Sequence, residues 1–473
     1  MRQISAAPLH IFRLFFSLCL ALEFIRHLYY NRACTWYADT PFHYRWEYPF
    51  NLLPLPTTTL TYQIHFVLTI IVSLCFATGR HHRFVGTLLF GLYGWCFSWD
   101  KSYYNNHYYL ILLFIFELTA VGTNTKRRFI PQWHLLLLRY QLSIVYIYGG
   151  IAKLNDDWIN GWPVRKWMTT AFNDAMNDVF SELNVDARST LNQEWGLQLQ
   201  LIPEGCTWFL VYGGLFFDLL IVPMMVWSKR SRRVGVVLIF AFHSINACLF
   251  SIGIFPMLGI CSTVLFYDDA EELPLWMVSL VKEKEDEENE EDSSEQRHGQ
   301  SIIGRRTLCC LILFAVVQLG LPLRHFIYHM GTDGQVVGWT GNGELFAWRM
   351  MLTSKECTGY FVVQYRNRQG EEEREKVYVE TLGLSQKQEW RAFQHSDYTV
   401  QLARYVASTF QMQEEGGGKE TSTRLTVVHS VYVFAECELN GNHMKQKCMN
   451  SSINLLDGNI SSMKRKLWLP MRP

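Results

Sequence analysis

Long apolar stretches recur along the first two thirds of this chain, and short polar or basic segments separate them. Each stretch is long enough to cross, or nearly cross, the roughly 30 Å hydrocarbon core of a bilayer. The pattern predicts a polytopic α-helical membrane protein with about nine membrane helices. The predicted membrane helices cover 9–30, 58–78, 83–99, 107–123, 134–153, 206–227, 233–248, 251–267 and 306–323.

The seventh and eighth stretches form one continuous apolar run that is interrupted only at Gly253 and Pro256. A single helix of that length would exceed the bilayer thickness, so we expect a hairpin or a broken helix there. At the start of the chain, residues 10–29 are apolar and no small-residue cleavage site follows them. This segment is therefore expected to be a signal anchor that forms the first span.

Basic residues set the predicted orientation. They cluster in four short segments, at 79–83, 126–128, 229–233 and 305–306. All four lie on one side if the seventh-eighth run crosses twice, and the positive-inside rule makes that side the cytosol. The N-terminus is then cytosolic, and the tail is lumenal or extracellular. Glycosylation sequons at Asn450 and Asn459 agree with this topology.

The composition changes along the chain in a way that predicts two domains. Residues 1–324 form a helical transmembrane domain, with an acidic cytosolic linker over 268–305, and residues 325–473 form a lumenal or extracellular α+β domain. The segment from Arg165 to Leu183 predicts an amphipathic helix at the membrane interface. In the tail, we expect strands at Tyr360–Tyr365, Lys376–Glu380 and Leu425–Phe434, and one helix over Ser385–Phe410.

Charge and cysteine content exclude several classes. The chain has 43 basic and 43 acidic residues, a balance that argues against a nucleic-acid partner. Its 12 cysteines show no spacing typical of zinc ligands, so no metal site is expected. The outer side permits disulfides, and a bond from Cys34 to Cys437 or to Cys448 is open. The other cysteines predicted on that side are Cys206 and Cys357.

A single lysine, Lys153, ends the fifth apolar stretch just before an Asp-Asp-Trp loop. A charged side chain is costly in a bilayer, so this lysine is either an interfacial anchor or a base. The preceding Gly149 and Gly150 let another helix or a flat ligand approach closely. Enclosed among aromatic residues, the lysine would offer a neutral amine as a general base.

Two further polar clusters lie at membrane depth. Tyr104, Asn105, Asn106 and His107 begin the fourth span, where an asparagine cap with a locally bonded histidine is the alternative to a reaction site. His243 and Asn246 share one helix face inside a later span, where the alternative is a structural interhelical hydrogen bond.

Several separate segments carry a family pattern. These segments are Asp100–Lys101 with 104–110 (YNNHYYL), 151–158 (IAKLNDDW), 242–253 (FHSINACLFSIG), 321–325 (LPLRH), 348–351 (WRMM), 439–441 (LNG) and 468–470 (WLP). Together they resemble the vitamin K-dependent γ-glutamyl carboxylases, a family with the horizontally transferred transmembrane (HTTM) domain. The resemblance extends over essentially the whole chain.

The resemblance implies an enzyme whose lysine, matched by Lys153, deprotonates reduced vitamin K (the hydroquinone). The hydroquinone anion captures O₂ and becomes a base that removes a γ-proton from glutamate; the carbanion adds CO₂, and the quinone leaves as its 2,3-epoxide. His107 matches a catalytic histidine, and no metal takes part. The cofactor-binding residues implied are Tyr104, Asn105, Asn106, His243 and Asn246.

The resemblance also implies a glutamate-containing protein or peptide as substrate, lipid as surroundings, and a multi-pass location in the endoplasmic reticulum. Two positions depart from the family pattern: Tyr104 stands where tryptophan is common, and Ala152 where a lysine is common. Vertebrate members continue with a lumenal extension after the last matched segment, so the protein substrate is open. The alternatives are a quinone epoxidase without peptide carboxylation and a non-catalytic membrane transporter or scaffold.

Overall fold

The computed structural model divides the chain into two compact units. The first unit is Met1–Ile147 with Leu219–Pro322, and the second is Tyr148–Asp218 with Leu323–Pro473. The predicted linker over 268–305 falls partly outside the described residues. The structure describes residues 2–47, 53–121, 128–182, 193–250, 252–280, 303–330, 337–367, 369–412, 427–441, 444–460, 464 and 466–471.

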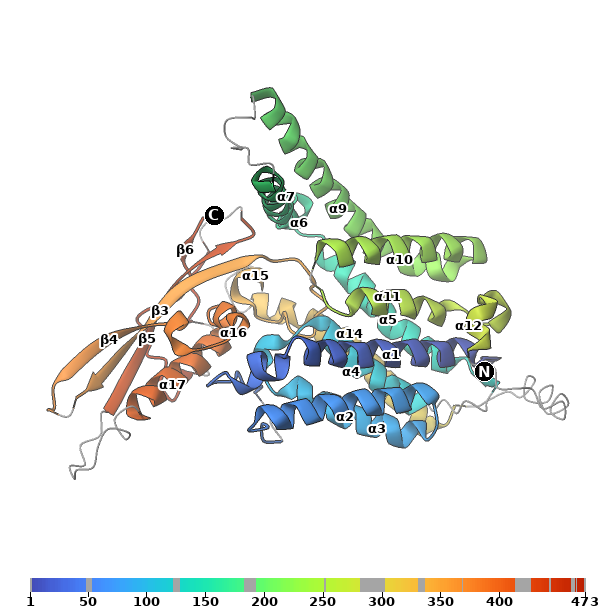
Figure 1. Ribbon diagram of the computed structural model, residues 1–473, viewed down its shortest axis with the longest axis horizontal. Coiled ribbons are helices and arrows are strands. Elements are labelled where there is room, and N and C mark those ends of the chain that lie inside the picture. Colours follow the sequence, from blue (N-terminus) through green and yellow to red (C-terminus); the bar gives the residue numbers. More distant parts are fainter. Residues whose placement is uncertain are drawn as a thin grey trace. The chain divides into compact units, whose positions relative to one another are not determined.

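The first unit is built mainly from helices (Figure 1). Helix α1 packs along α2, α3 packs against α4, and a short antiparallel ribbon joins β1 to β2. The α-helices are α1 Ala7–Tyr29, α2 Thr59–Thr78, α3 His82–Ser98, α4 Asn106–Val121, α5 Trp133–Ala152, α10 Lys229–Leu249, α11 Phe255–Cys261, α12 Leu275–Ser279 and α14 Arg305–Met330. The short elements are β1 Gln3–Ser5, β2 Phe129–Pro131, and the turns Ala33–Ala38, Lys101–Tyr103, Ser262–Phe266 and Ala270–Glu272.

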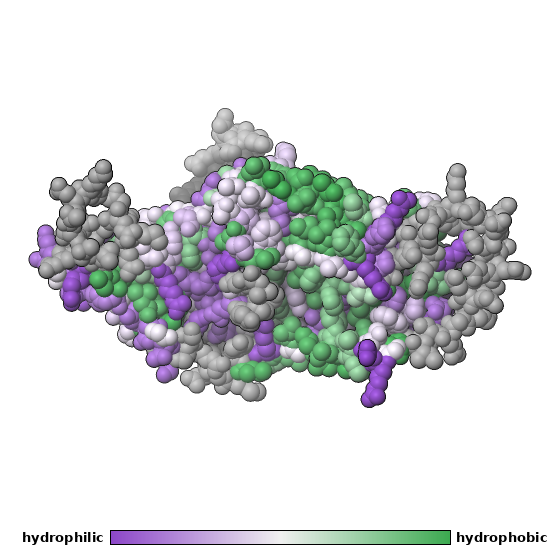
Figure 2. All heavy atoms as spheres, turned by 90° about the horizontal axis from the view of Figure 1, so that it is seen from below, coloured by the Kyte–Doolittle hydropathy of each residue, from purple (hydrophilic) through white to green (hydrophobic). Residues whose placement is uncertain are grey.

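Six described helices are long and apolar enough to cross a membrane. They are Ala7–Tyr29, Thr59–Thr78, Trp133–Ala152, Pro203–Trp227, Lys229–Leu249 and Arg305–Arg324. Figure 2 shows hydrophobic residues gathered in a broad surface, and large apolar side chains such as Leu60 and Phe84 are exposed. The predicted multi-pass helical class is confirmed, whereas nine crossings stay a prediction because the shorter apolar helices do not reach that length.

The predicted break in the seventh-eighth run is confirmed. Helix α10 ends at Leu249, Gly253 takes a φ of +63°, and Pro256 lies in the first turn of α11. Proline lacks a backbone N–H and is therefore well placed at a helix start. Helix α10 packs against α11 where Gly259 meets the ring of His243, and a Cβ on that glycine would lie 2.1 Å from Nε2. Only glycine allows this close approach.

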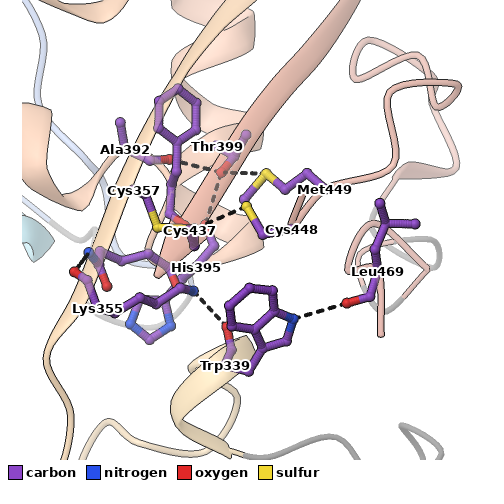
Figure 3. Close-up of a disulfide and its surroundings, with 12 residues drawn as sticks. Trp339, Lys355, Cys357, Ala392, His395, Thr399, Cys437, Cys448, Met449 and Leu469 are labelled. Carbon is purple, nitrogen blue, oxygen red and sulfur yellow. Dashed lines mark hydrogen bonds between the residues drawn. A yellow bond between two sulfur atoms is a disulfide. The ribbon is translucent and has the colours of Figure 1, made fainter. Parts of the chain in front are cut away.

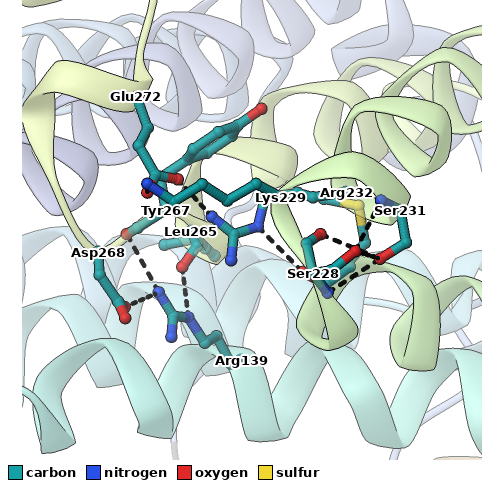
Figure 4. Close-up of polar contacts among 10 residues, drawn as sticks. Arg139, Ser228, Lys229, Ser231, Arg232, Leu265, Tyr267, Asp268 and Glu272 are labelled. Carbon is teal, nitrogen blue, oxygen red and sulfur yellow. Dashed lines mark hydrogen bonds and ion pairs between the residues drawn. The ribbon is translucent and has the colours of Figure 1, made fainter.

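An ion-pair cluster ties the segment after α11 to two helices of the first unit (Figure 4). Arg139 of α5 donates to Asp268 at 2.8 Å and to the carbonyl of Leu265. Arg232 of α10 pairs with Glu272 at 2.6 Å. Part of the basic segment that set the predicted orientation is thus neutralised by local carboxylates.

The second unit contains a four-stranded antiparallel sheet in the order β4-β3-β5-β6. Helix α17 packs on β3 and β5. The strands are β3 Lys355–Arg366, β4 Glu372–Tyr378, β5 Val427–Leu439 and β6 Gln446–Lys447. The helices are α6 Asp156–Ile159, α7 Val164–Glu182, α9 Gln193–Trp227, α15 Val337–Thr340, α16 Gln386–Arg391 and α17 Ser396–Met412, with a 3₁₀ turn at Val379–Leu382.

Within the described residues the three predicted strands are present, although β4 ends at Tyr378. Helix α7 covers 165–182 of the segment predicted from Arg165 to Leu183. Leu183 and residues 425–426 of the third predicted strand lie outside the described residues. The single helix predicted over Ser385–Phe410 is wrong, because it is divided into α16 and α17. The carbonyl of Gln394 in the break accepts from Lys355 Nζ at 3.0 Å, and its side-chain amide donates to the carbonyl of Lys355. The backbone carbonyl and the side chain of Gln394 are therefore bonded to β3, whereas a continuous helix would use the carbonyl within the helix.

Candidate active site

Lys153 lies in the turn between α5 and α6, in the part of the chain that belongs to the second unit. Its backbone N–H donates to the carbonyl of Gly150 as α5 ends, and Asn155 caps α6 by accepting from the N–H of Trp158. The lysine is buried, with 6% of its surface exposed. The end of one helix and the start of the next thus fix the position of this side chain.

Asp218 of α9 is the direct partner of Lys153. The Nζ atom lies 2.5 Å from Asp218 Oδ2 and 3.4 Å from the carbonyl oxygen of Gly149. Both side chains are buried, so each charged group is compensated by the other rather than by water. Asp218 was not predicted as a site residue, although an acidic residue inside the apolar stretch 206–227 is the signal that marks it.

Two glycines lie against this pair. A Cβ on Gly149 would lie 3.1 Å from Asp218 Oδ2, and one on Gly214 would lie 3.9 Å from Lys153 Cε. The ring of Trp158 covers the amine, with its centroid 5.2 Å from Nζ, and its indole N–H donates to the carbonyl of Val211. The pair is therefore flanked by bare backbone and an aromatic wall.

The loop that follows Lys153 is bound to the sheet of the same unit. Asn440, just after β5, donates to Asp157 at 2.6 Å. Lys166 of α7 pairs with Glu356 of β3 at 2.7 Å and with Glu438 of β5 at 2.9 Å. Two motifs that sequence analysis recorded separately, Asp157–Trp158 and Leu439–Gly441, thus come together and position the lysine turn.

The other predicted site residues belong to the first unit. The ring of Phe255 on α11 has its centroid 6.2 Å from that of His107 and 5.5 Å from that of His243. His243 Nε2 lies 3.0 Å from the hydroxyl of Tyr146 on α5. The two histidines therefore share one aromatic neighbour, and His243 is fully buried.

The remaining predicted residues lie at the ends of helices. The hydroxyl of Tyr104 donates to Asn106 Oδ1 at 2.8 Å, and the carbonyl of Asn105 accepts from the first amides of α4. The carbonyl of Asn246 accepts from the N–H of Phe250 as α10 ends. Lys153 belongs to the second unit and these residues to the first, so the structure describes two clusters, each by itself.

Two family models match the chain. The model of the HTTM domain matches residues 1–270. The model of the vitamin K-dependent gamma-carboxylase lumenal domain matches residues 304–472. The chain belongs to the γ-glutamyl carboxylase family. No solved structure matches it.

Membership in the γ-glutamyl carboxylase family assigns a vitamin K-dependent carboxylase-like role on glutamate-containing protein substrates. The buried amine, the flanking glycines and the aromatic wall fit a flat ring that carries an ionisable hydroxyl group. Within the described ranges, no group of three or more His, Cys, Asp or Glu residues is placed to hold a metal ion.

A second buried lysine, Lys355 at the start of β3, was not singled out by sequence analysis (Figure 3). Its Nζ donates to the carbonyls of Trp339 at 2.6 Å and Gln394 at 3.0 Å, and lies 3.9 Å from the ring centroid of Trp468. Burial lowers the pKa of Lys355 to about 7, although nearby Cys448 and Glu344 act in the opposite direction. This lysine is held by carbonyls and rings rather than by a carboxylate.

The disulfide of the structure lies beside Lys355. Cys357 and Cys437 face each other on β3 and β5 and form the bond, while Cys448 carries a free thiol 3.0 Å from the sulfur of Cys437. Cys34 is also free and donates to Asp39. Neither bond that the sequence left open for Cys34 is present in the structure: Cys437 pairs with Cys357, and Cys34 and Cys448 are both free.

Proposed function

We propose that this protein oxidises reduced vitamin K to its 2,3-epoxide and couples that reaction to γ-carboxylation of protein glutamate. The observation that carries the proposal is the buried Lys153–Asp218 pair between two glycines. When bound, reduced vitamin K supplies, together with O₂, the strong base that glutamate carboxylation by CO₂ requires.

Lys153 is the proposed base. Asp218 makes the lysine amine neutral when it accepts a proton from Nζ. In a low-dielectric site, an ion pair and its neutral counterpart differ by the position of one proton between Nζ and Oδ2. When that proton lies on Oδ2, the Nζ lone pair is free to take a proton from a hydroquinone hydroxyl. The short Nζ–Oδ2 contact of 2.5 Å supports this exchange.

The bare backbone and the indole beside the pair have a second task. Gly149 and Gly214 allow a planar ring to approach the amine, and Trp158 excludes water from it. Exclusion of water strengthens electrostatic interactions and prevents a strong base from being quenched.

We assign the predicted residues of the first unit to holding the cofactor. His107 and His243 both offer imidazole nitrogens near Phe255, and Tyr146 orients the second of them. Tyr104, Asn105, Asn106 and Asn246 supply hydroxyl or amide groups at the adjoining helix ends. His107 keeps its proposed catalytic role as a hydrogen-bonding partner of the reacting oxygen.

We also propose the location and the domain plan. The protein lies in the endoplasmic reticulum membrane, residues 1–324 form the transmembrane domain, and residues 325–473 form a lumenal domain with glycans on Asn450 and Asn459. The basic segments support a cytosolic N-terminus.

The proposal is tested by supplying microsomes that contain the protein with reduced vitamin K, labelled bicarbonate and a short glutamate peptide. We expect both the epoxide and the labelled peptide. Epoxide without labelled peptide would restrict the activity to quinone oxidation, and the absence of both products would leave a transporter or scaffold.

A further inference from the structure

A cluster of charged side chains lies at the C-terminal end of α1 and in the turn that follows it, in the first unit. Glu23 Oε1 accepts from Arg26 Nη2 at 2.7 Å, and it lies 3.6 Å from His27 Nδ1 and 3.8 Å from Arg32 Nη1. Glu23 and His27 are buried, and the Arg32 guanidinium stacks on Trp36 at 4.3 Å from the ring centroid. Ionic groups are rare at such positions unless they pair with each other or bind a ligand.

The cluster contains more positive than negative charge. Arg26 and Arg32 are guanidinium cations, and Glu23 is the one carboxylate, among the described groups, whose charge acts on Arg32. Arg26 spends one N–H on Glu23, whereas its buried Nε–H has no hydrogen-bond partner within the described part of the chain. An excess of one cation in such a partly buried cluster is stabilised when an anion binds.

Gly253 lies against this cluster. A Cβ on Gly253 would lie 3.1 Å from Arg26 Nη2, 3.6 Å from His107 Nε2 and 3.9 Å from Glu23 Oε1. Side chains from α1 and α4 therefore converge on one point of the backbone between α10 and α11. The φ of +63° at Gly253 is a second reason for glycine at this position.

We propose that Arg26, beside Gly253, binds the side-chain carboxylate of the substrate glutamate. The inference rests on the proposed function and adds a substrate site to it. A planar guanidinium group matches a carboxylate better than it matches an isolated hydroxyl. Removal of a proton from the carbon next to that carboxylate increases its negative charge, which a guanidinium group counters.

The test compares Arg26→Gln with wild-type protein in the presence of reduced vitamin K, labelled bicarbonate and the glutamate peptide. Loss of a charge-assisted hydrogen bond is expected to raise the KM for the peptide by about 10- to 100-fold. The KM for reduced vitamin K stays within about twofold. The amount of epoxide formed per carboxylated glutamate rises, because the base is made but the substrate is poorly held.

Arg26→Lys keeps the charge without the planar guanidinium group. Its KM for the peptide is expected to lie between those of wild-type protein and Arg26→Gln. Arg230→Gln removes an exposed arginine elsewhere on the first unit and serves as the matched control with unchanged ratios. All rates are divided by the amount of folded, detergent-extracted protein, so that a folding defect is not counted as a loss of binding.

Two results overturn the inference while leaving the proposed function intact. One is an unchanged peptide KM in Arg26→Gln; the other is an increase confined to the KM for reduced vitamin K, which would make the quinone oxygen the bound group. If wild-type protein forms neither product, the proposed function itself is wrong, and the substrate site falls with it.

Discussion

Lys153 and Lys355 are both buried lysines of the second unit, but their neighbours differ in kind. Lys153 faces the carboxylate of Asp218 at 2.5 Å and is flanked by glycines. Lys355 is enclosed by two backbone carbonyls and the ring of Trp468. A carboxylate partner can exchange a proton with the amine, whereas a carbonyl can only accept a hydrogen bond. This difference supports the proposal that Lys153 acts as a base, whereas Lys355 holds β3 to Trp339 and Gln394.

The largest expected effect is the loss of Lys153. Lys153→Ala should lower epoxide and carboxylated product together by about 10²–10⁴-fold, since both depend on the same deprotonation. Lys355→Met serves as the matched control, and its turnover per folded molecule should stay near that of wild-type protein. Near-native epoxidation by Lys153→Ala would show that this lysine is only an anchor.

Asp218 comes next, because it acts through the lysine. Asp218→Asn keeps the volume but removes the proton acceptor, so we expect both products to fall by about 10²-fold. The pH dependence of turnover should change as well, and Asp218→Glu should restore part of the rate. A variant with unchanged turnover and an unchanged pH profile would reduce Asp218 to a structural counter-ion.

Lys355 is expected to affect stability through pH. Its pKa of about 7 lies below the ordinary 10.5, so the unfolded chain binds this proton more tightly than the folded one. The contribution of Lys355 to the free energy of unfolding is largest above about pH 10.5. It decreases as the pH falls towards about 7 and is constant below that. We expect a change of roughly 2–5 kcal/mol across that interval.

The measurement is denaturant unfolding of the full chain in detergent at several pH values. Lys355→Met should flatten the dependence, whereas Lys376→Met, which removes an exposed lysine of β4, should leave it unchanged. An equal slope in wild-type protein and Lys355→Met would contradict a lowered pKa for this lysine.

A third lysine of the same unit gives the smallest effect. Lys166 pairs with Glu356 and Glu438, but these groups are partly or largely exposed. Exposed pairs are worth about 0–1 kcal/mol, and they weaken as salt is added. Lys166→Met should therefore lower the free energy of unfolding by less than about 1 kcal/mol. A loss of several kcal/mol that persists in high salt would contradict this prediction, because the pairs would then behave as buried ion pairs.

The same contrast explains what could be predicted from sequence. Apolar periodicity is local, so it located the helices and the break near Gly253, and it placed Lys153 at the end of a span. Asp218 escaped because 65 residues separate it from Lys153 and no local spacing links them. The residues of the two clusters could be named from the sequence. The contacts within each cluster could not be predicted, because they join segments that are distant in the chain.

Tertiary contacts also account for the error over Ser385–Phe410. The sequence does not show whether a lysine in a strand is buried. The hydrogen bond from Lys355 to Gln394, at the break between α16 and α17, could therefore not be predicted. The disulfide was missed for a related reason: Cys357 and Cys437 become partners only through the register of β3 and β5.

The most direct test of the central claim is chemical rescue. Small primary amines are added to Lys153→Ala, which has space where the side chain was, and epoxide formation is measured against amine concentration. The account predicts a saturable recovery in Lys153→Ala, and no such effect of amines on wild-type protein or on Lys355→Met. Epoxide formation that stays at the background level with every amine, in a variant shown to be folded, would contradict a free amine at this position as the base.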